Sequence, residues 1–88
     1  MDERRQTVCE AFSRRLRAQR KRRGLTQEKL AELSGLDRTY VPQAESGRRN
    51  VSLVTMDKLA MALGIDLALL VSDLPCLTED GDMSQERD

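Results

Sequence analysis

The sequence contains no histidine and no tryptophan, and Phe12 and Tyr40 are its only aromatic residues. Without histidine, the chain cannot form a Cys/His zinc site or a histidine-based catalytic triad. Cys9 and Cys76 match no metal-binding or disulfide spacing, so we expect reduced thiols. Neither thiol has an evident activating partner. We therefore predict no catalytic residue, no metal site and no cofactor, and we expect that the protein is not an enzyme.

Long apolar runs are also missing. No stretch approaches the roughly 18 apolar residues of a membrane-spanning helix, and no signal peptide is recognisable. We expect a soluble, cytoplasmic protein without a membrane partner. The 88 residues allow one small domain of modest stability, which dimerisation would increase.

The charges balance overall but are unevenly distributed. Fifteen Lys/Arg match fifteen Asp/Glu, yet residues 1–71 carry a net charge of +5 and residues 72–88 a net charge of −5. Such asymmetry is typical of a nucleic-acid-binding face beside an acidic segment. The basic run at residues 20–23 is equally compatible with a solvated helix surface.

The spacing of apolar residues predicts helices, and no strict apolar/polar alternation predicts a strand. Val8, Phe12 and Leu16 recur at every fourth position, which predicts a helix over about residues 7–23, ended by Gly24. Four shorter helices should follow, of which the second ends near residue 46 and the last ends at residue 71. Their expected N-cap residues are Thr26, Asp37, Ser52 and Asp66, and the expected glycine stops are Gly35, Gly47 and Gly64.

Apolar side chains should line one face of these helices. The second helix would carry Leu30, Ala31 and Leu33. The fourth would carry a stripe of Leu53, Met56, Leu59, Ala60 and Leu63. The remaining segment, residues 72–88, contains six acidic residues, and we expect an acidic, flexible tail after a domain spanning residues 1–71. One hypothesis is that this tail mimics DNA and shields the basic residues.

Residues 27–46 have the pattern of a helix, a three-residue turn and a second helix, which can present the second helix to the DNA major groove. Ala31 is small where the helices would cross, and Gly35 suits a turn with positive φ. The residues expected to point inward are Leu30, Leu36, Val41 and Ala44.

At this point the sequence resembles the lambda-repressor-like, XRE-type helix-turn-helix family. The matching string runs from Leu16 to Ile65 and includes LTQEKLAELSGLDRTYV, the loop SGRRN and the segment LAMALGI. The resemblance implies an all-α, compact five-helix DNA-binding domain. It also implies a sequence-specific transcriptional regulator that binds an inverted-repeat operator in double-stranded DNA, commonly as a homodimer.

The expected base-reading residues lie at the start of the second helix of this motif. Arg38 and Thr39 should face base edges, with Tyr40 and Gln43 one turn later. Arginine suits guanine, and glutamine suits adenine. Tyr40 has an alternative position, with its ring packed on the helix and its hydroxyl near a phosphate.

Other residues should contact the DNA backbone or support the motif. Family members place a glutamine at the position of Gln27, where it bonds a phosphate and a recognition-helix side chain. Lys29 could also hold phosphate, because helix N-termini favour anions. The family's backbone-contacting loop matches Arg48, Arg49 and Asn50. In family members the residues aligned with Arg20 and Glu45 pair and hold the recognition helix in place.

Three positions depart from the family pattern. Pro42 lies inside the expected recognition helix, where a missing N–H costs about 3 kcal/mol unless the helix begins later. Ala44 replaces a larger aliphatic residue, and Lys29 replaces the acidic residue that would complete a capping box with Thr26.

The C-terminal end of the domain is unusually apolar for one short helix. The expected dimer interface consists of Leu67, Leu69, Leu70 and Val71, which Val54, Met61 and Ala62 could extend. The alternative is a lid on the core of a single chain. Small family members, including restriction–modification controller proteins, dimerise through this end. A second functional hypothesis is an antitoxin whose tail folds on a partner toxin while the domain represses its own promoter.

Overall fold

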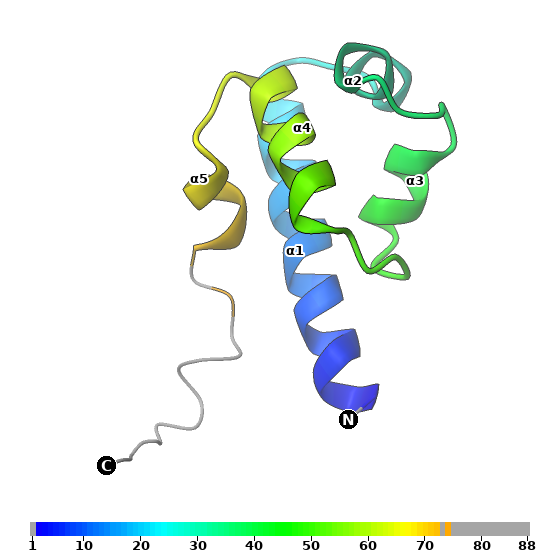
Figure 1. Ribbon diagram of the computed structural model, residues 1–88, viewed down its shortest axis with the longest axis vertical. Coiled ribbons are helices and arrows are strands. Elements are labelled where there is room, and N and C mark those ends of the chain that lie inside the picture. Colours follow the sequence, from blue (N-terminus) through cyan, green and yellow to red (C-terminus); the bar gives the residue numbers. More distant parts are fainter. Residues whose placement is uncertain (1, 73, 75–88) are drawn as a thin grey trace.

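The computed structural model describes residues 2–72 and residue 74. Residues 2–72 fold into five helices (Figure 1): α1 (Asp2–Arg22), α2 (Gln27–Ser34), α3 (Tyr40–Glu45), α4 (Leu53–Leu63) and α5 (Leu67–Val71). The all-α prediction is therefore confirmed for these residues. Most of the expected acidic tail, residue 73 and residues 75–88, lies outside the described residues.

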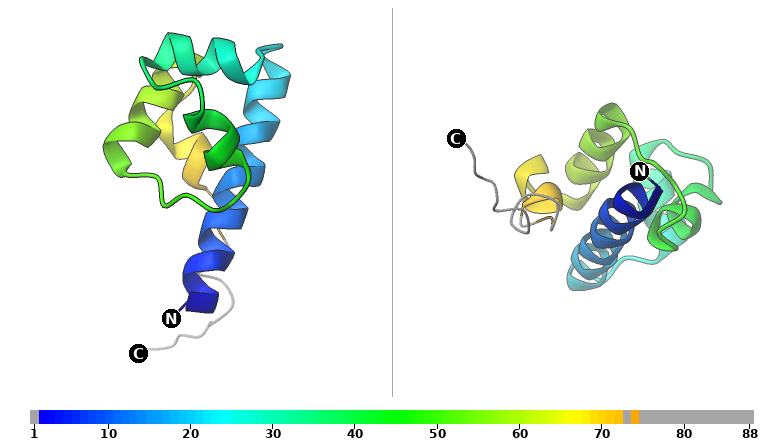
Figure 2. Two further views of the ribbon diagram at one scale, coloured as in Figure 1. Left: turned by 90° about the vertical axis from the view of Figure 1, so that its right-hand side faces the viewer. Right: turned by 90° about the horizontal axis from the view of Figure 1, so that it is seen from below.

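The long helix α1 runs along the molecule, and the other helices gather around its C-terminal half. Figures 1 and 2 show α3 and α5 on opposite sides of α1, with both helices packed against it. Helix α4 packs against α2 and α5. Helix α1 therefore separates the side of the molecule that carries α3 from the side that carries α5.

All five helices contribute to a single core. Its largest fully enclosed side chains are Leu16, Leu30, Val41, Leu59, Leu63 and Leu70. The predicted inward positions agree, since Ala31 and Ala44 are also buried and Leu36 is partly buried. Each enclosed leucine contributes about 1.5–3 kcal/mol by leaving water.

Two apolar residues do not lie where the sequence predicted. Leu33 is exposed because α2 buries the face formed by Leu30, Ala31 and Ser34, and position 33 lies off that face. Leu53 is also exposed, because it is the first residue of α4 and precedes the buried stripe. Both predictions were wrong.

The helix boundaries follow local hydrogen bonding. Thr26 Oγ1 accepts the Lys29 amide at 3.0 Å, and Ser52 Oγ accepts the Thr55 amide at 3.1 Å, as expected of N-caps. Asp66 makes no such side-chain bond to α5. Helix α1 begins at Asp2, five residues before the predicted start, and the bond from Gln6 to Glu10 supports its first turns.

Candidate nucleic-acid interface

The turn after α2 sets the direction of α3. Gly35 adopts a left-handed conformation with φ of +71°, which an L side chain rarely adopts. Its N–H bonds the Glu32 carbonyl, and the Leu36 N–H bonds the Ala31 carbonyl at 2.9 Å, so the chain reverses directly. Ala31 is buried, as the close packing of α2 and α3 requires. The connection spans residues 35–39 and is longer than the predicted three residues.

Helix α3 begins later than expected. Its first residue is Tyr40, so Arg38 and Thr39 lie in the preceding turn and Asp37 is not the N-cap. Pro42 is consequently the third helical residue, and its missing N–H interrupts no intrahelical bond. The first α-helical bond runs from the Gln43 N–H to the Thr39 carbonyl at 3.4 Å. The late start accommodates the proline without a kink.

Asp37 organises this turn through Thr39. Its Oδ2 accepts hydrogen bonds from the Thr39 hydroxyl and from the Thr39 N–H, the latter at 3.0 Å. The hydrogen bond from the Thr39 hydroxyl lowers the pKa of the Asp37 carboxyl below its ordinary value. The bond from the Thr39 N–H lowers this pKa further, by a smaller amount. The Thr39 hydroxyl proton is therefore engaged by Asp37, which leaves the hydroxyl oxygen as an acceptor and the methyl group for contact with a thymine.

Arg38 is held by a residue of α2. Its Nη2 lies 2.6 Å from Glu28 Oε2, and the two side chains remain 76% and 68% exposed. Exposed ion pairs of this kind contribute about 0–1 kcal/mol, so exchange of Glu28 for another partner costs little. Glu28 was not identified from the sequence, because it lies ten positions from Arg38 and only the turn brings the two together.

Three of the four expected base readers lie around one open groove between α2 and α3. This cavity has a volume of about 480 Å³, and its wall includes Gln27, Arg38, Thr39 and Gln43 together with Glu28 and Pro42. The fold thus brings three of the four predicted base readers beside Gln27. The groove could admit the edge of a base pair or a phosphate.

Tyr40, the fourth residue expected to read bases, lies in a cluster with Gln43 and Arg49. The Arg49 guanidinium carbon is 4.3 Å from the centre of the Tyr40 ring. Arg49 Nη1 also donates to Gln43 Oε1 at 2.6 Å. One lone pair of the Gln43 side-chain carbonyl is therefore in use, and the side-chain NH₂ group remains as a donor. Such a glutamine suits an acceptor on a base edge, whereas the bidentate adenine contact expected from the sequence requires the carbonyl as well.

The pair expected between Arg20 and Glu45 is present and nearly buried. Arg20 Nε lies 2.7 Å from Glu45 Oε2, and Arg20 Nη2 lies 3.0 Å from Oε1. Arg20 Nη1 also donates to the Leu25 carbonyl, and Gln27 Nε2 donates to Glu45 Oε1 at 3.0 Å. Glu45 thus links α3 to both α1 and the start of α2.

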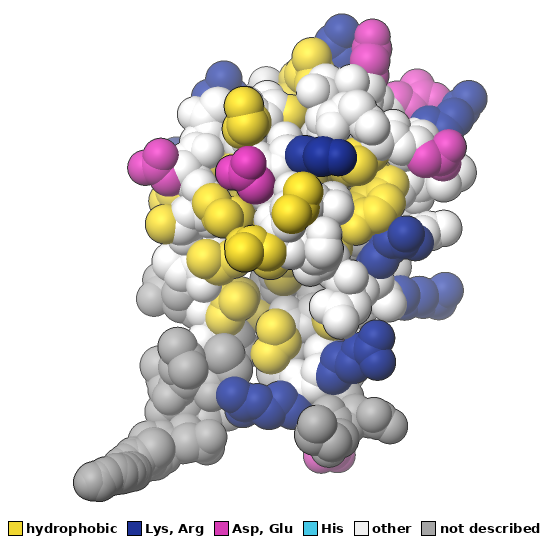
Figure 3. Space-filling model, in the orientation of Figure 1, with side chains coloured by type: hydrophobic (Ala, Val, Ile, Leu, Met, Phe, Trp, Pro, Cys, Tyr) yellow, Lys and Arg dark blue, Asp and Glu magenta, His cyan; other side chains and the backbone are white. Residues whose placement is uncertain are grey.

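The loop after α3 lies beside the N-terminal part of α1. Arg48 lines a cavity of about 290 Å³ with Arg5 and Gln6, which the sequence did not identify as site residues. Arg5 could have been predicted as a site residue if the start of α1 at Asp2 had been recognised in the sequence. Asn50 of this loop is exposed. On the exposed surface of α2, Lys29 Nζ lies 3.6 Å from Glu32 Oε1. Figure 3 shows Lys and Arg side chains in a row down the α3 side of the molecule.

Apolar side chains gather over α4 and α5, away from this basic row (Figure 3). The exposed ones on these two helices are Leu53, Val54, Met61 and Leu69. Leu67 and Val71 are partly buried. Leu70 is fully enclosed in the core of the single chain, so the expectation that it lies at a dimer interface is corrected.

The described residues meet neither the requirements of a membrane-spanning helix nor those of a metal site. None of the helices in residues 2–72 is long and apolar enough to cross a membrane. Within the part of the chain that the structure describes, no three Cys, Asp or Glu side chains gather closely enough to hold a metal ion.

Comparison with known proteins gives a consistent result. The helix-turn-helix family model HTH_3 matches residues 16–70 of the chain. Control protein C.MunI from a Mycoplasma species is 45% identical over 64 residues, which cover 72% of this chain and 86% of that protein. Control protein C.SmaI from Serratia marcescens is 39% identical over 74 residues, covering 84% of this chain and 88% of its own.

A solved structure shows the same likeness. The restriction–modification controller protein C.AhdI from Aeromonas hydrophila superimposes with a TM-score of 0.72 and 52% sequence identity. The match covers 74% of this chain and 94% of that protein. Both the sequence and the arrangement of helices are therefore shared.

Proposed function

Because this chain belongs to the HTH_3 helix-turn-helix family of DNA-binding transcription regulators, we propose that it is a controller of restriction–modification genes that binds an inverted-repeat operator as a homodimer. The family is not one of enzymes. The relatives' names give no support to the antitoxin hypothesis, since they describe control proteins, a repressor and transcriptional regulators. We further propose that the protein controls its own gene. The protein would act in the cytoplasm, on the DNA of the nucleoid.

The single observation that carries the proposal is the set of hydrogen bonds that link Glu45 to both Arg20 and Gln27. This link fixes α3 on the body of the domain, so that the residues before and along α3 meet DNA in one orientation. The proposed base contacts are Arg38, Thr39, Tyr40 and Gln43. The proposed phosphate contacts are Gln27, Lys29, Arg48, Arg49 and Asn50.

The apolar surface of α4 and α5 supports the homodimer. Val54 and Met61 lie seven positions apart on α4, and therefore on one face, and both are exposed. Together with Leu67, Leu69 and Val71 they offer a surface that a second copy would remove from water. A symmetric dimer would place two copies of α3 about 34–36 Å apart, one helical turn of DNA.

Selection of bound duplexes from a random DNA pool tests the proposal. We expect enrichment of an inverted repeat whose half-sites lie about 10 base pairs apart. Affinity for the selected duplex should fall with salt, because phosphate contacts release counterions. No enrichment, with binding that vanishes as salt rises, would contradict sequence-specific recognition. A matched variant, Arg38→Ala, should lose preference at one base pair while it keeps its fold.

A further inference from the structure

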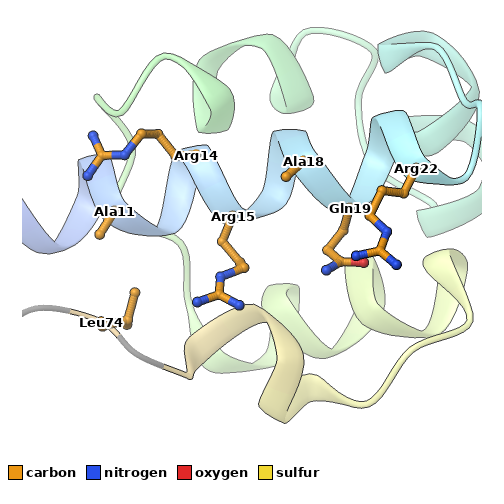
Figure 4. A pocket seen from close by; sticks show the side chains of 7 residues that line it. All are labelled: Ala11, Arg14, Arg15, Ala18, Gln19, Arg22 and Leu74. Atoms are coloured by element: carbon orange, nitrogen blue, oxygen red, sulfur yellow. The ribbon is translucent and has the colours of Figure 1, made fainter.

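A second basic groove lies between α1 and the end of α5, on the side of α1 away from α3. The cavity has a volume of about 550 Å³ and is lined by Arg14, Arg15, Gln19, Arg22, Leu74 and two alanines. Figure 4 shows Arg15, Gln19 and Arg22 extending from α1 toward α5. Among the described residues, the lining contains three guanidinium groups and no carboxylate, so this groove favours an anion.

Two of these arginines have no anionic partner in the part of the chain that the structure describes. Neither Arg14 nor Arg22 forms an ion pair with a described residue, whereas Arg20 and Arg38 on the α3 side each bind a glutamate. Arg14 and Arg22 therefore carry positive charge that no described carboxylate neutralises.

The path of the chain brings an acidic segment to this groove. Arg15 Nη2 donates to the Ser72 carbonyl at 2.7 Å, which fixes the end of α5 against α1. Leu74 then forms part of the groove wall. The next fourteen residues, 75–88, contain five acidic residues and one basic residue. An acidic segment thus begins at the mouth of a cationic groove.

The chain that follows Leu74 is long enough to run the length of the groove. The groove follows α1 for about three turns, or roughly 16 Å at 1.5 Å per residue. An extended chain covers about 3.3 Å per residue, so five residues beyond Leu74 span a similar length. Glu79, Asp80 and Asp82 can therefore meet the guanidinium groups of Arg14 and Arg22 without any rearrangement of the helices.

We propose that the acidic segment at residues 79–82 binds back into the groove that contains Arg14, Arg15 and Arg22, within the same chain. Exposed ion pairs are individually weak, but the short tether gives the segment a high effective concentration at the groove. DNA bound at α3 lies on the other side of α1, so its phosphates do not compete for this position. The bound segment would lower the positive charge of the body and leave α3 uncovered, in contrast to a shield over the base readers.

Backbone NMR relaxation of the full chain tests this inference. We expect order parameters above about 0.6 for residues 79–82 at about 0.01 M salt, and values below this, typical of a free end, at about 1 M. The Debye length falls from about 30 Å to about 3 Å over this range. Order parameters that are low at both salt concentrations would overturn the proposal.

A pair of matched variants separates specific binding from general attraction. The double substitution Arg14→Gln with Arg22→Gln should release residues 79–82 at low salt. Arg17→Gln with Lys21→Gln removes the same charge from exposed positions of α1 outside the groove and should leave these residues ordered. Equal release in both variants would show diffuse attraction only and would refute the groove. Unchanged order in Arg14→Gln/Arg22→Gln, with reduced operator affinity, would assign the groove to DNA phosphates and also refute the proposal.

Discussion

Glu45, the last residue of α3, accepts hydrogen bonds of 2.7 Å and 3.0 Å from Arg20 of α1, one on each carboxylate oxygen. The two side chains are only 11% and 2% exposed. A bidentate arginine–carboxylate pair has one preferred geometry, so it fixes the rotation of α3 about its own axis. That rotation decides which side chains of α3 face DNA.

Replacement of Glu45 should destabilise the fold. Glu45→Gln leaves the Arg20 guanidinium nearly buried without its carboxylate, and loss of one partner of a buried pair costs about 3–5 kcal/mol. Denaturant unfolding followed by circular dichroism measures this change. Glu32→Gln removes the same charge from an exposed position and should change the free energy of unfolding by less than about 0.5 kcal/mol. Equal midpoints for the two variants would contradict a supporting role for the pair.

Release of Arg38 should strengthen DNA binding. In Glu28→Gln, Arg38 no longer has to break its ion pair with Glu28 before it contacts DNA. Removal of the negative charge of Glu28 also reduces the repulsion of DNA phosphates. We expect a gain of up to about fivefold in operator affinity, equivalent to about 1 kcal/mol, with little change in thermal stability. Fluorescence anisotropy on the selected operator provides the measurement. The gain should disappear in an Arg38→Ala background, and its persistence there would show that Glu28 acts only through general charge.

Arg49 should influence the base preference of Gln43. Arg49→Ala removes a proposed phosphate contact, which should reduce the salt slope of binding by about one. It also frees the Gln43 carbonyl from its 2.6 Å bond, so preference should relax at the same base pair that Gln43→Ala affects. Competition binding with single-base operator variants measures both effects. Strict additivity in the double variant would mean that Arg49 and Gln43 act separately.

The exposed apolar surface of α4 should be required for dimerisation. Met61 is 74% exposed in the single chain, so Met61→Glu should preserve the helical circular dichroism spectrum. A glutamate buried between two copies would be costly, and sedimentation equilibrium should therefore show a monomer. Leu33→Glu introduces the same change on the exposed surface of α2 and should remain dimeric. A dimeric Met61→Glu protein would exclude this face as the interface.

The turn before α3 should lose stability in acid. Because the folded-state pKa of Asp37 lies below the unfolded value of about 3.9, its contribution to stability is present above that pH and is lost as pH falls through the folded pKa. Thr39→Val removes the hydroxyl donor and should raise the Asp37 pKa toward its ordinary value. Carboxyl NMR titration measures the shift. Thr7→Val, whose hydroxyl bonds the Glu3 carbonyl, should leave the Asp37 titration unchanged.

Features set by short stretches of chain were predictable from the sequence. Thr26 and Ser52 cap helices because a hydroxyl reaches an amide three residues away, whatever the rest of the fold does. Gly35 ends α2 because glycine adopts a positive φ at little cost. The four-residue spacing of Phe12 and Leu16 likewise places both in the core. Together these signals define an all-α domain with a helix-turn-helix.

Features that depend on how the helices meet were decided only by the tertiary structure. Arg38 lies beside Glu28 because the chain reverses between α2 and α3. Leu70 belongs to the core because α5 packs on α1 and α4, although sequence alone marks it as equally suited to an interface. The groove beside Arg22 exists because Arg15 holds the end of α5. The pairing of Arg38 with Glu28, the packing of α5 on α1 and the bond from Arg15 to Ser72 all join residues ten or more positions apart. Hydrophobic periodicity along a single helix carries no information about which distant partners are within reach.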